Sequence, residues 1–557
     1  MTIVLIGGDR PTTIPSIDEI GGKAAGLALM AARGVPVPPA FVLPISMCAD
    51  INAGDRKAER ELDEGLRQGI AFLETVSGKQ FGDRRTPLLV SVRSGAARSM
   101  PGMMDTVLDV GASSAAIGGL TRMTGDPRFA WDCRQRFIES YATVVLGLDR
   151  APFAAALAKI LADERLEGER DLDCEALERL AVSYQGLAED SGWMEDPMRQ
   201  LTDAARAVYG SWMSERALTF RRLHGLDHLK GTAVTVQIMV FGNRGPASGA
   251  GVAFSRDPST GGAHPVVEVL FDAQGEEVVS GRRTPHAEEA ITHAMPAVAA
   301  ELRDILRRLE LEFHDVQDVE FTIENGALWI LQTRSAKRSP LAALRIAIDL
   351  VREELISPQE ALRRLAELNL DALVRVRLDA PGVPAACGIG ASAGVATGRV
   401  AFDSASAGRQ ASAGDPVILV RPDTSTADVA GFAVAAGIVT AQGGRTAHAA
   451  LVARQMGKPG VVGCEALNVD PAARIARFAG RIISEGEWIS IDGDNGAIYF
   501  GRANIIRERP TADLAELDRW RAATDSRAAG EAEPKVRSRH IKSTSFPPGS
   551  RARPGRR

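Results

Sequence analysis

Aromatic residues are scarce in this chain of 557 residues, where Phe, Trp and Tyr together account for 5%. Proteins that bind single-stranded nucleic acid stack bases on such side chains. A net charge of −5 also provides no general attraction for a polyanion. We therefore expect no nucleic acid among the partners of this chain.

Cysteines and long apolar runs are also in short supply. No two of the five cysteines show the spacing of a metal-binding pair. No apolar run approaches the roughly 18 residues that cross a membrane. An odd cysteine count and the absence of a secretory signal are typical of a reducing compartment. We expect a cytoplasmic protein without a membrane-spanning segment, in which Cys464 is a packing residue.

The remaining composition indicates a multidomain globular protein. Hydrophobic residues make up 45% of the chain and charged residues 25%, as in most folded proteins. At this length we expect roughly two to four domains, each with a core of its own.

The stretch with the most chemistry is QGGRTAHAALVARQMGKPGVVG, residues 442–463. Gly443 and Gly444 allow a tight turn after a short apolar strand. The apolar residues that follow recur at helical spacing until Gly457. This pattern predicts that His448 lies in the first turn of a helix that follows a glycine loop.

A histidine in this position is suited to carry a phosphoryl group. Imidazole is a competent nucleophile near neutral pH, and the free N–H groups of a helix N-terminus favour a bound phosphate. Arg445 and Thr446 add a cation and a hydroxyl beside His448. The alternative is a loop histidine that only donates to a carbonyl.

The whole stretch is similar to the phosphohistidine signature of the family that includes pyruvate phosphate dikinase, phosphoenolpyruvate synthase and enzyme I of the sugar phosphotransferase system. In that family the histidine of a GG-x-T-x-H-A-A-x-x-A-R pattern is phosphorylated, and the resemblance implies this role for His448. Ala447 departs from the serine usual in the dikinase branch. Arg445 is more typical of the synthase branch than the methionine common in dikinases.

Two earlier segments carry cations beside glycine-rich turns. Gly21-Gly22-Lys23 precedes a predicted helix over residues 24–33, which is either a phosphate site or an ordinary helix start. Residues 88–92 predict a buried strand with Arg93 at its end, before a small-residue loop at 99–104. Arg93 could grip phosphates bidentately, or form a structural ion pair. Both segments resemble the dikinase nucleotide-binding domain, where the lysine contacts ATP phosphates.

Residues 231–262 predict two strands of one sheet, joined by a glycine-rich connection. Gln237 to Val240 would suit one wall of an adenine pocket. The following segment, AQGEEVVSGRRTP at 273–285, again resembles the dikinase, and the resemblance implies that Glu276 contacts the nucleotide.

The segment QDVEFTIENGALWILQTRSAKR, residues 317–338, predicts a hairpin that turns at Asn325-Gly326. Residues two apart on a strand face the same side, which pairs Asp318 with Glu320 and Gln332 with Arg334. Two carboxylates beside a polyphosphate suit Mg²⁺, and the alternative is a solvated outer face of the hairpin. The resemblance implies that these four residues bind metal, the attacked phosphates and inorganic phosphate.

The predicted fold class is α+β and multidomain. We expect an ATP-grasp nucleotide-binding domain over residues 1–340, with a helical insertion at about 112–225, and a helical connector over 341–380. A swivelling phosphohistidine α/β domain is expected over 381–505. Residues 506–557 would form a short helix, DLAELDRWRAA, and a disordered basic tail.

Dikinases continue into a (β/α)₈ barrel that binds pyruvate or phosphoenolpyruvate. Such a barrel needs about 250 residues, so we expect it to be absent from this chain. The resemblance implies that ATP and phosphate, with Mg²⁺, phosphorylate His448 and yield AMP and diphosphate. A separate barrel protein would then accept the phosphoryl group. A homodimer of this chain is a further candidate assembly. The alternatives are a kinase of another small molecule and a truncated, non-catalytic nucleotide-binding protein.

Overall fold

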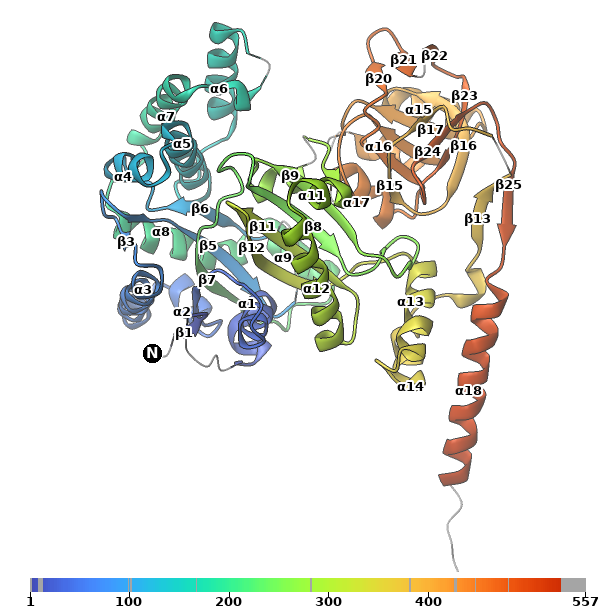
Figure 1. Ribbon diagram of the computed structural model, residues 1–557, viewed down its shortest axis with the longest axis horizontal. Coiled ribbons are helices and arrows are strands. Elements are labelled where there is room, and N and C mark those ends of the chain that lie inside the picture. Colours follow the sequence, from blue (N-terminus) through green and yellow to red (C-terminus); the bar gives the residue numbers. More distant parts are fainter. Residues whose placement is uncertain are drawn as a thin grey trace, which may run out of the picture.

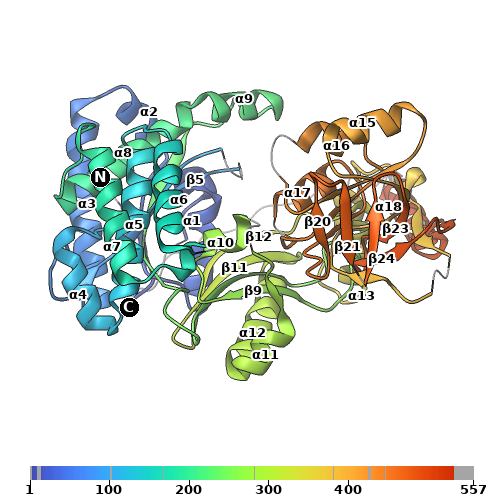
Figure 2. The ribbon, with the colours of Figure 1, turned by 90° about the horizontal axis from the view of Figure 1, so that it is seen from above.

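The computed structural model describes residues 3–8, 14–98, 100, 103–166, 168–280, 283–379, 382–424, 428–445, 447–478 and 480–531. The chain is a mixed helix-and-sheet protein with several domains (Figures 1 and 2). Two five-stranded sheets and a layer of helices form the amino-terminal part. An eight-stranded sheet with short helices forms the part that carries His448.

The first sheet is antiparallel, with strand order β1-β2-β7-β5-β6. Every residue of its central strand β7 is buried, because helices cover both faces of the sheet. One face packs on the helical layer and the other on α1. The strands are β1 (Val4–Ile6), β2 (Ala40–Leu43), β5 (Val90–Ala96), β6 (Thr106–Val110) and β7 (Thr232–Ile238).

The helical layer contains the helices predicted within residues 112–225, and these predictions are confirmed. Its helices are amphipathic: α3, for example, buries residues at helical spacing such as Leu62, Leu66 and Leu73. The Asp55 side chain caps α3 by accepting from two backbone N–H groups. The helices are α2 (Met47–Asn52), α3 (Arg56–Ser77), α4 (Ser114–Thr124), α5 (Pro127–Val144), α6 (Ala151–Glu164), α7 (Cys174–Glu189), α8 (Pro197–Gly210) and α9 (Glu215–Leu223). A short pair, β3 (Gln80–Phe81) and β4 (Pro87–Leu88), joins α3 to β5.

The second sheet is also antiparallel, with strand order β10-β9-β8-β11-β12. Alternate side chains of β8 enter two different hydrophobic cores, because α1, α11 and α12 cover one face and α13, α14 and α18 the other. The strands are β8 (Gly249–Phe254), β9 (Val266–Phe271), β10 (His286–Ala287), β11 (Gln317–Glu324) and β12 (Ala327–Ser335). The covering helices are α1 (Ile17–Ala32), α11 (Glu288–Ala294), α12 (Pro296–Phe313), α13 (Pro340–Arg352), α14 (Pro358–Arg364) and α18 (Thr511–Glu531).

The prediction that residues 232–238 and 249–254 share one sheet is wrong. β7 lies in the first sheet and β8 in the second, so the glycine-rich connection crosses between sheets. Gly242 makes this crossing possible, because a Cβ there would lie 2.2 Å from the carbonyl oxygen of Ala273. The segment between β7 and β8 therefore joins the two sheets directly.

The hairpin β11–β12 confirms the turn predicted at Asn325-Gly326. Both turn residues have positive φ, 49° and 79°, as a two-residue hairpin turn of this kind requires. Asp318 lies opposite Arg334 in the ladder, and Glu320 opposite Gln332. All four predicted side chains therefore belong to two adjacent cross-strand pairs.

The connector and the carboxyl-terminal helix meet on the second sheet. Helix α18 is longer than the predicted DLAELDRWRAA, and Leu517 packs it into the same core as α13 and α14. The ribbon of β13 (Arg375–Leu378) and β25 (Ile505–Glu508) links this helical platform to the eight-stranded sheet (Figure 1). The predicted basic tail from residue 532 onward lies outside the described residues.

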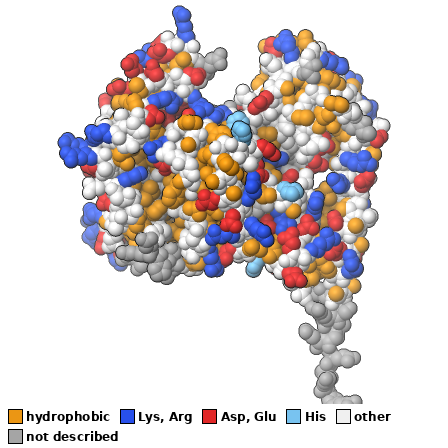
Figure 3. Space-filling model, viewed as in Figure 1, with side chains coloured by type: hydrophobic (Ala, Val, Ile, Leu, Met, Phe, Trp, Pro, Cys, Tyr) orange, Lys and Arg blue, Asp and Glu red, His pale blue; other side chains and the backbone are white. Residues whose placement is uncertain are grey.

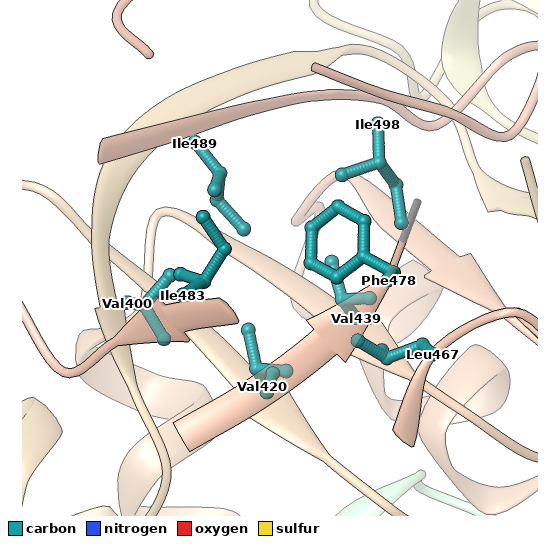
Figure 4. Close-up of a pocket in the computed structure, with 9 residues that line it drawn as sticks. Val400, Val420, Val439, Leu467, Phe478, Ile483, Ile489 and Ile498 are labelled. Atoms are coloured by element: carbon teal, nitrogen blue, oxygen red, sulfur yellow. The ribbon is translucent and has the colours of Figure 1, made fainter. Parts of the chain in front are cut away.

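The eight-stranded sheet has the order β14-β24-β23-β16-β17-β18-β19-β15. Its edge strands β14 and β15 are separated in the chain only by Gly388, so the sheet curls back toward itself. Figure 4 shows its interior, where apolar side chains face a small cavity. The strands are β14 (Ala386–Cys387), β15 (Ile389–Ser392), β16 (Val395–Ala401), β17 (Val417–Arg421), β18 (Gly437–Thr440), β19 (Gly460–Val462), β23 (Trp488–Asp492) and β24 (Ala497–Phe500).

Shorter elements complete this part of the chain. A three-stranded sheet covers the cavity with Phe478 and Ile483. Cys464 is fully buried in the same core, as predicted for a packing residue, and burial raises its pKa to about 11. These elements are α15 (Ser404–Ser412), α16 (Val429–Val434), α17 (His448–Gln455), β20 (Asn468–Asp470), β21 (Ile475–Phe478) and β22 (Arg481–Ser484).

The surface mixes charges of both signs. On the face shown in Figure 3, acidic and basic side chains are interspersed, and the surface is hollowed between the helical layer and the part that carries His448. Across the ranges that the structure describes, no helix has both the length and the apolar character to span a bilayer.

Candidate active site

Four of the predicted site residues, from four separate elements, line one pocket. Lys23 comes from α1, Arg93 from β5, Gln237 from β7 and Gln332 from β12. The pocket therefore lies between the first and second sheets, with α1 along it. Its complete lining is Lys23, Ala24, Leu27, Arg93, Ser94, Thr235, Gln237, Leu331 and Gln332.

A kink in α1 presents Lys23 to the pocket. The helix begins at Ile17, earlier than the predicted residue 24, but Gly21 interrupts it with φ 78° and ψ 160°. A Cβ at Gly21 would lie 2.0 Å from the carbonyl oxygen of Gly95, so only glycine fits. This close approach fixes the lysine next to strand β5.

Arg93 lies in the middle of β5, and the prediction that it ends the strand is wrong. The small residues 94–96 continue the strand, because they pair with β7: Ser94 lies opposite Val234 and Ala96 opposite Thr232. Among the described residues, the polar contacts of Arg93 are long, 3.4 Å from Nη1 to Gln237 Oε1 and 3.8 Å from Nη2 to Glu320 Oε2. Its guanidinium keeps most of its hydrogen-bonding capacity for a ligand. Of the predicted loop at 99–104, residues 99, 101 and 102 lie outside the described residues.

The hairpin brings a carboxylate pair to the same place. Arg334 Nε donates to Asp318 Oδ2 at 2.7 Å, while the buried Asp318 Oδ1 has no hydrogen-bond partner within the described part of the chain. Glu320 forms a long ion pair with Arg93. Unsatisfied carboxylate oxygens of this kind fit a hard divalent cation. No cluster of three or more His, Cys, Asp or Glu side chains suited to a metal occurs among the described residues, so a cation here would take its other ligands from phosphates or water.

The protonation of these groups reflects their crowded surroundings. Lys23 is enclosed by the walls of the cleft but keeps part of its side chain open to solvent. Burial and the nearby Arg93 lower the pKa of Lys23 to about 8, against the opposing effect of Glu320. Burial likewise raises the pKa of Asp318, although the Arg334 contact opposes it.

Two predicted residues lie elsewhere. Val240 follows β7, in the connection that crosses between the two sheets. Glu276 is exposed on α10 (Gly275–Ser280), and its charged neighbours include Arg136 and Glu277 rather than the lysine of the pocket. The structure thus places Glu276 next to the helical layer.

Helix α17 begins at His448, which confirms that this residue lies in the first turn of a helix after a glycine loop. Thr446 and the side chain of His448 lie outside the described residues. The loop before the helix docks on the second sheet. The backbone N–H of Arg445 donates to both carboxylate oxygens of Glu268 on β9, at 2.7 and 3.0 Å.

Small residues allow this docking. Gly444 lies against Pro285, so closely that a Cβ there would be 2.5 Å from the proline ring. Arg454 of α17 donates to the carbonyl oxygens of Ala391 and Arg445, and its charge acts on Asp318. The helix that carries His448 therefore lies on the same sheet as the carboxylates of the pocket.

Sequence reasoning missed Thr235 and Glu268. Thr235 lies two residues before Gln237 on β7, so the two-residue period of a strand could have placed both on the pocket. Glu268 contacts a residue 177 positions away in the chain, and no local pattern predicts such a contact.

Two family models match the chain. "Pyruvate phosphate dikinase, AMP/ATP-binding domain" matches residues 55–298 and 287–354. "PEP-utilising enzyme, mobile domain" matches residues 413–496, which include α17. The first model covers the helical layer from α3 onward, the strands β5, β6 and β7 of the first sheet and the whole second sheet. The second model covers β17, β18, β19 and β23 of the eight-stranded sheet.

Curated relatives share the name pyruvate, phosphate dikinase. The protein from Rhizobium meliloti (strain 1021) is 41% identical over 528 residues, which are 91% of this chain and 58% of the relative. That from Clostridium symbiosum is 40% identical, over 86% of this chain and 56% of its own. The protein from Zea mays, named "Pyruvate, phosphate dikinase 2", is 39% identical over 90% of this chain and 57% of the relative. The chain spans just over half the length of these relatives. It belongs to the pyruvate phosphate dikinase family.

Proposed function

We propose that this chain is a phosphotransferase of the dikinase type, in which ATP and inorganic phosphate phosphorylate His448. In this proposal residues 1–340 form an ATP-grasp unit and residues 381–505 a swivelling phosphohistidine unit. The observation that carries it is the convergence of Lys23, Arg93, Gln237 and Gln332 on one pocket, on whose second sheet the His448 helix is docked.

The pocket suits a nucleoside triphosphate. Gln237 lies near the end of β7 and Val240 in the connection that follows it, and we assign the adenine to this stretch. Lys23, Arg93 and Arg334 would neutralise the phosphate charge, because they come from three elements that face the same space. Burial of the cations among protein walls strengthens their attraction for phosphate.

The carboxylates fit the Mg²⁺ that the family implies. Asp318 and Glu320 would hold it, since Asp318 Oδ1 is buried without a partner and Glu320 is only 3.8 Å from Arg93. Such an ion supplies charge neutralisation at the phosphate oxygens when it is bound. In its absence Arg93 and Arg334 hold the two carboxylates in place.

The reaction that we infer has two steps. An imidazole nitrogen of His448 attacks the β-phosphorus of ATP and AMP leaves with the electron pair of the cleaved bond, so that histidine carries a diphosphoryl group. Inorganic phosphate then attacks the γ-phosphorus and forms diphosphate, while the bond from the γ-phosphorus to the bridging oxygen breaks. That oxygen keeps the electron pair and stays on the phosphoryl group that His448 retains. Arg93 and Arg334 would stabilise the charge that develops during each transfer.

The final acceptor is part of the proposal as well. We infer that the phosphoryl group passes to pyruvate, giving phosphoenolpyruvate, on a barrel outside these 557 residues. The names of the relatives support pyruvate as the acceptor. For this transfer the histidine helix must leave the second sheet, and the β13–β25 ribbon is the link that remains when it does.

The experiment that tests the proposal uses ATP labelled at the β-phosphate, with Mg²⁺ and inorganic phosphate. We expect acid-labile, base-stable label on the wild-type chain and formation of AMP. His448→Ala should abolish both and leave ATP binding intact. His264→Ala is the matched control, because His264 is exposed on the connection between β8 and β9. ATP binding without any label on the wild type would overturn the phosphohistidine mechanism.

A further inference from the structure

The pocket contains a buried hydroxyl that no predicted role accounts for. Thr235 on β7 is 6% exposed, and its Oγ1 has no hydrogen-bond partner in the described part of the chain. Buried hydroxyls are normally paired, since leaving one unpaired costs the free energy of its lost hydration. Valine would fill the same space and suit a strand equally well. A threonine at this position therefore points to a partner that enters with a ligand.

The sheet register places this hydroxyl beside Arg93. Thr235 lies directly opposite Arg93 in the β5–β7 ladder, and directly opposed residues project from the same face of a sheet. Both residues line the pocket, together with Lys23. Arg93 contacts Gln237 and Glu320, both at long range, and it makes no hydrogen bond with the Thr235 hydroxyl in the described part of the chain.

The position along β7 distinguishes the two ends of a nucleotide. Gln237 lies further along the strand, toward the connection assigned to the adenine, which contains Val240. Thr235 lies directly opposite Arg93 in the ladder, and both residues line the pocket with Lys23. A hydroxyl beside these cations is suited to meet the anionic end of the ligand rather than its base.

We propose that the Thr235 hydroxyl donates a hydrogen bond to the phosphate oxygen of the bound nucleotide that Arg93 also contacts. This inference rests on the proposed function, because it assumes that ATP occupies the pocket. It adds a neutral donor to a set of cations, and a hydroxyl directed at an anion forms a short, charge-assisted bond. Thr235 thus becomes a ligand-binding residue for the phosphate chain.

The test compares Thr235→Val, which keeps the shape and removes the hydroxyl, with Thr235→Ser, which keeps the hydroxyl. Affinities for ATP and for adenosine are measured by calorimetry on the full chain. We expect Thr235→Val to weaken ATP binding about 10- to 100-fold, the range for loss of a hydrogen bond to a charged group. Thr235→Ser should restore most of the affinity, and adenosine binding should be unchanged in both variants.

A stability measurement separates a ligand role from a structural one. Thr235→Val removes an unpaired buried hydroxyl, so the unliganded variant should melt no lower than the wild type. Thr333→Val is the matched control: Thr333 is 7% exposed, and its Oγ1 donates to Gln317 Oε1 at 2.8 Å. That variant should melt lower and bind ATP normally.

Each outcome has one meaning. Failure of the wild type to bind ATP overturns the proposed function. Normal ATP affinity in Thr235→Val, with a wild type that binds, overturns this inference and leaves the proposed function standing. Equal losses for ATP and adenosine would assign the hydroxyl to the ribose or base and overturn the phosphate contact. A lower melting temperature for unliganded Thr235→Val would show that the hydroxyl is paired within the protein.

Discussion

The nucleotide pocket and the histidine helix are held in opposite ways. The pocket side chains lie on paired strands, where ladder register fixes Arg93 opposite Thr235 and Asp318 opposite Arg334. The loop before α17 instead meets the second sheet through a backbone N–H, at Glu268, and through a glycine against Pro285. The pocket is formed by residues within the sheets, whereas the loop before α17 contacts the second sheet from outside.

This difference suits the proposed reaction, in which the histidine is phosphorylated at the pocket and then transfers the group at a second site. Side chains fixed by a ladder are pre-organised, so that little entropy is lost when phosphate binds. A contact made by backbone and glycine involves no interdigitated side chains, and it can open without repacking a core. Changes in the pocket should therefore affect binding and chemistry, whereas changes at the docking contact should affect only the transfer rate.

The largest effect is expected at Arg93, which tests the pocket half of the comparison between pocket and docking contact. Arg93→Lys should slow phosphorylation of His448 about 100-fold or more, because lysine cannot replace a planar, bidentate donor at the phosphates. Label on His448 measured at saturating ATP checks this. Arg199→Lys, on an exposed arginine that pairs with Asp203 on the same helix, serves as the control. A loss below about threefold would remove Arg93 from the site.

The kink at Gly21 tests how rigid the pocket is. Gly21→Ala should destabilise the fold by about 3 kcal/mol or more, since it combines a disfavoured φ with a clash against Gly95. Chemical denaturation measures the change. Gly78→Ala is the control, because Gly78 also has positive φ, 67°, but no atom within 4 Å of its Cβ position. It should lose only about 1 kcal/mol, and equal losses would contradict the interlock between α1 and β5.

Glu268 tests the docking contact. Glu268→Gln should slow phosphorylation of His448 about tenfold, because a neutral amide accepts the Arg445 N–H more weakly than a carboxylate does. ATP affinity should not change. Single-turnover labelling and calorimetry measure the two quantities separately. Glu288→Gln, on a glutamate paired with Arg303, is a suitable control. If ATP affinity fell in parallel with the rate, docking and pocket would form one unit and the comparison would fail.

The smallest effect concerns pH. The pKa of Lys23 is lowered to about 8 in the free protein, and bound phosphate favours the protonated amine. ATP affinity should therefore fall as pH rises through 8, by at most about tenfold per pH unit. Lys23→Arg should keep a constant affinity from pH 7 to 10, because arginine stays protonated. An affinity of the wild type that does not change over this range would separate Lys23 from the phosphates.

Local sequence determined the hairpin and the helix start well. Asn325-Gly326 specifies its own turn, and the two-residue period then places Asp318 and Glu320 correctly. Sequence places the end of β5 too early, because the small residues 94–96 carry no strand preference. Only pairing with β7 extends the strand through Ala96. Long-range contacts are different in kind. That β7 and β8 belong to separate sheets depends on how the whole chain packs.

The β13–β25 ribbon makes the histidine-bearing part an insertion. Leu378 pairs with Ile505, and the N–H of Asp379 donates to the carbonyl of Asn504 at 2.9 Å, so the chain leaves and returns at neighbouring points. Residues between them could be excised as a cassette and the ends rejoined by a short turn. The platform of α13, α14 and α18 would remain closed by its own core. The histidine-bearing part is therefore joined to the rest of the chain at a single pair of neighbouring strands.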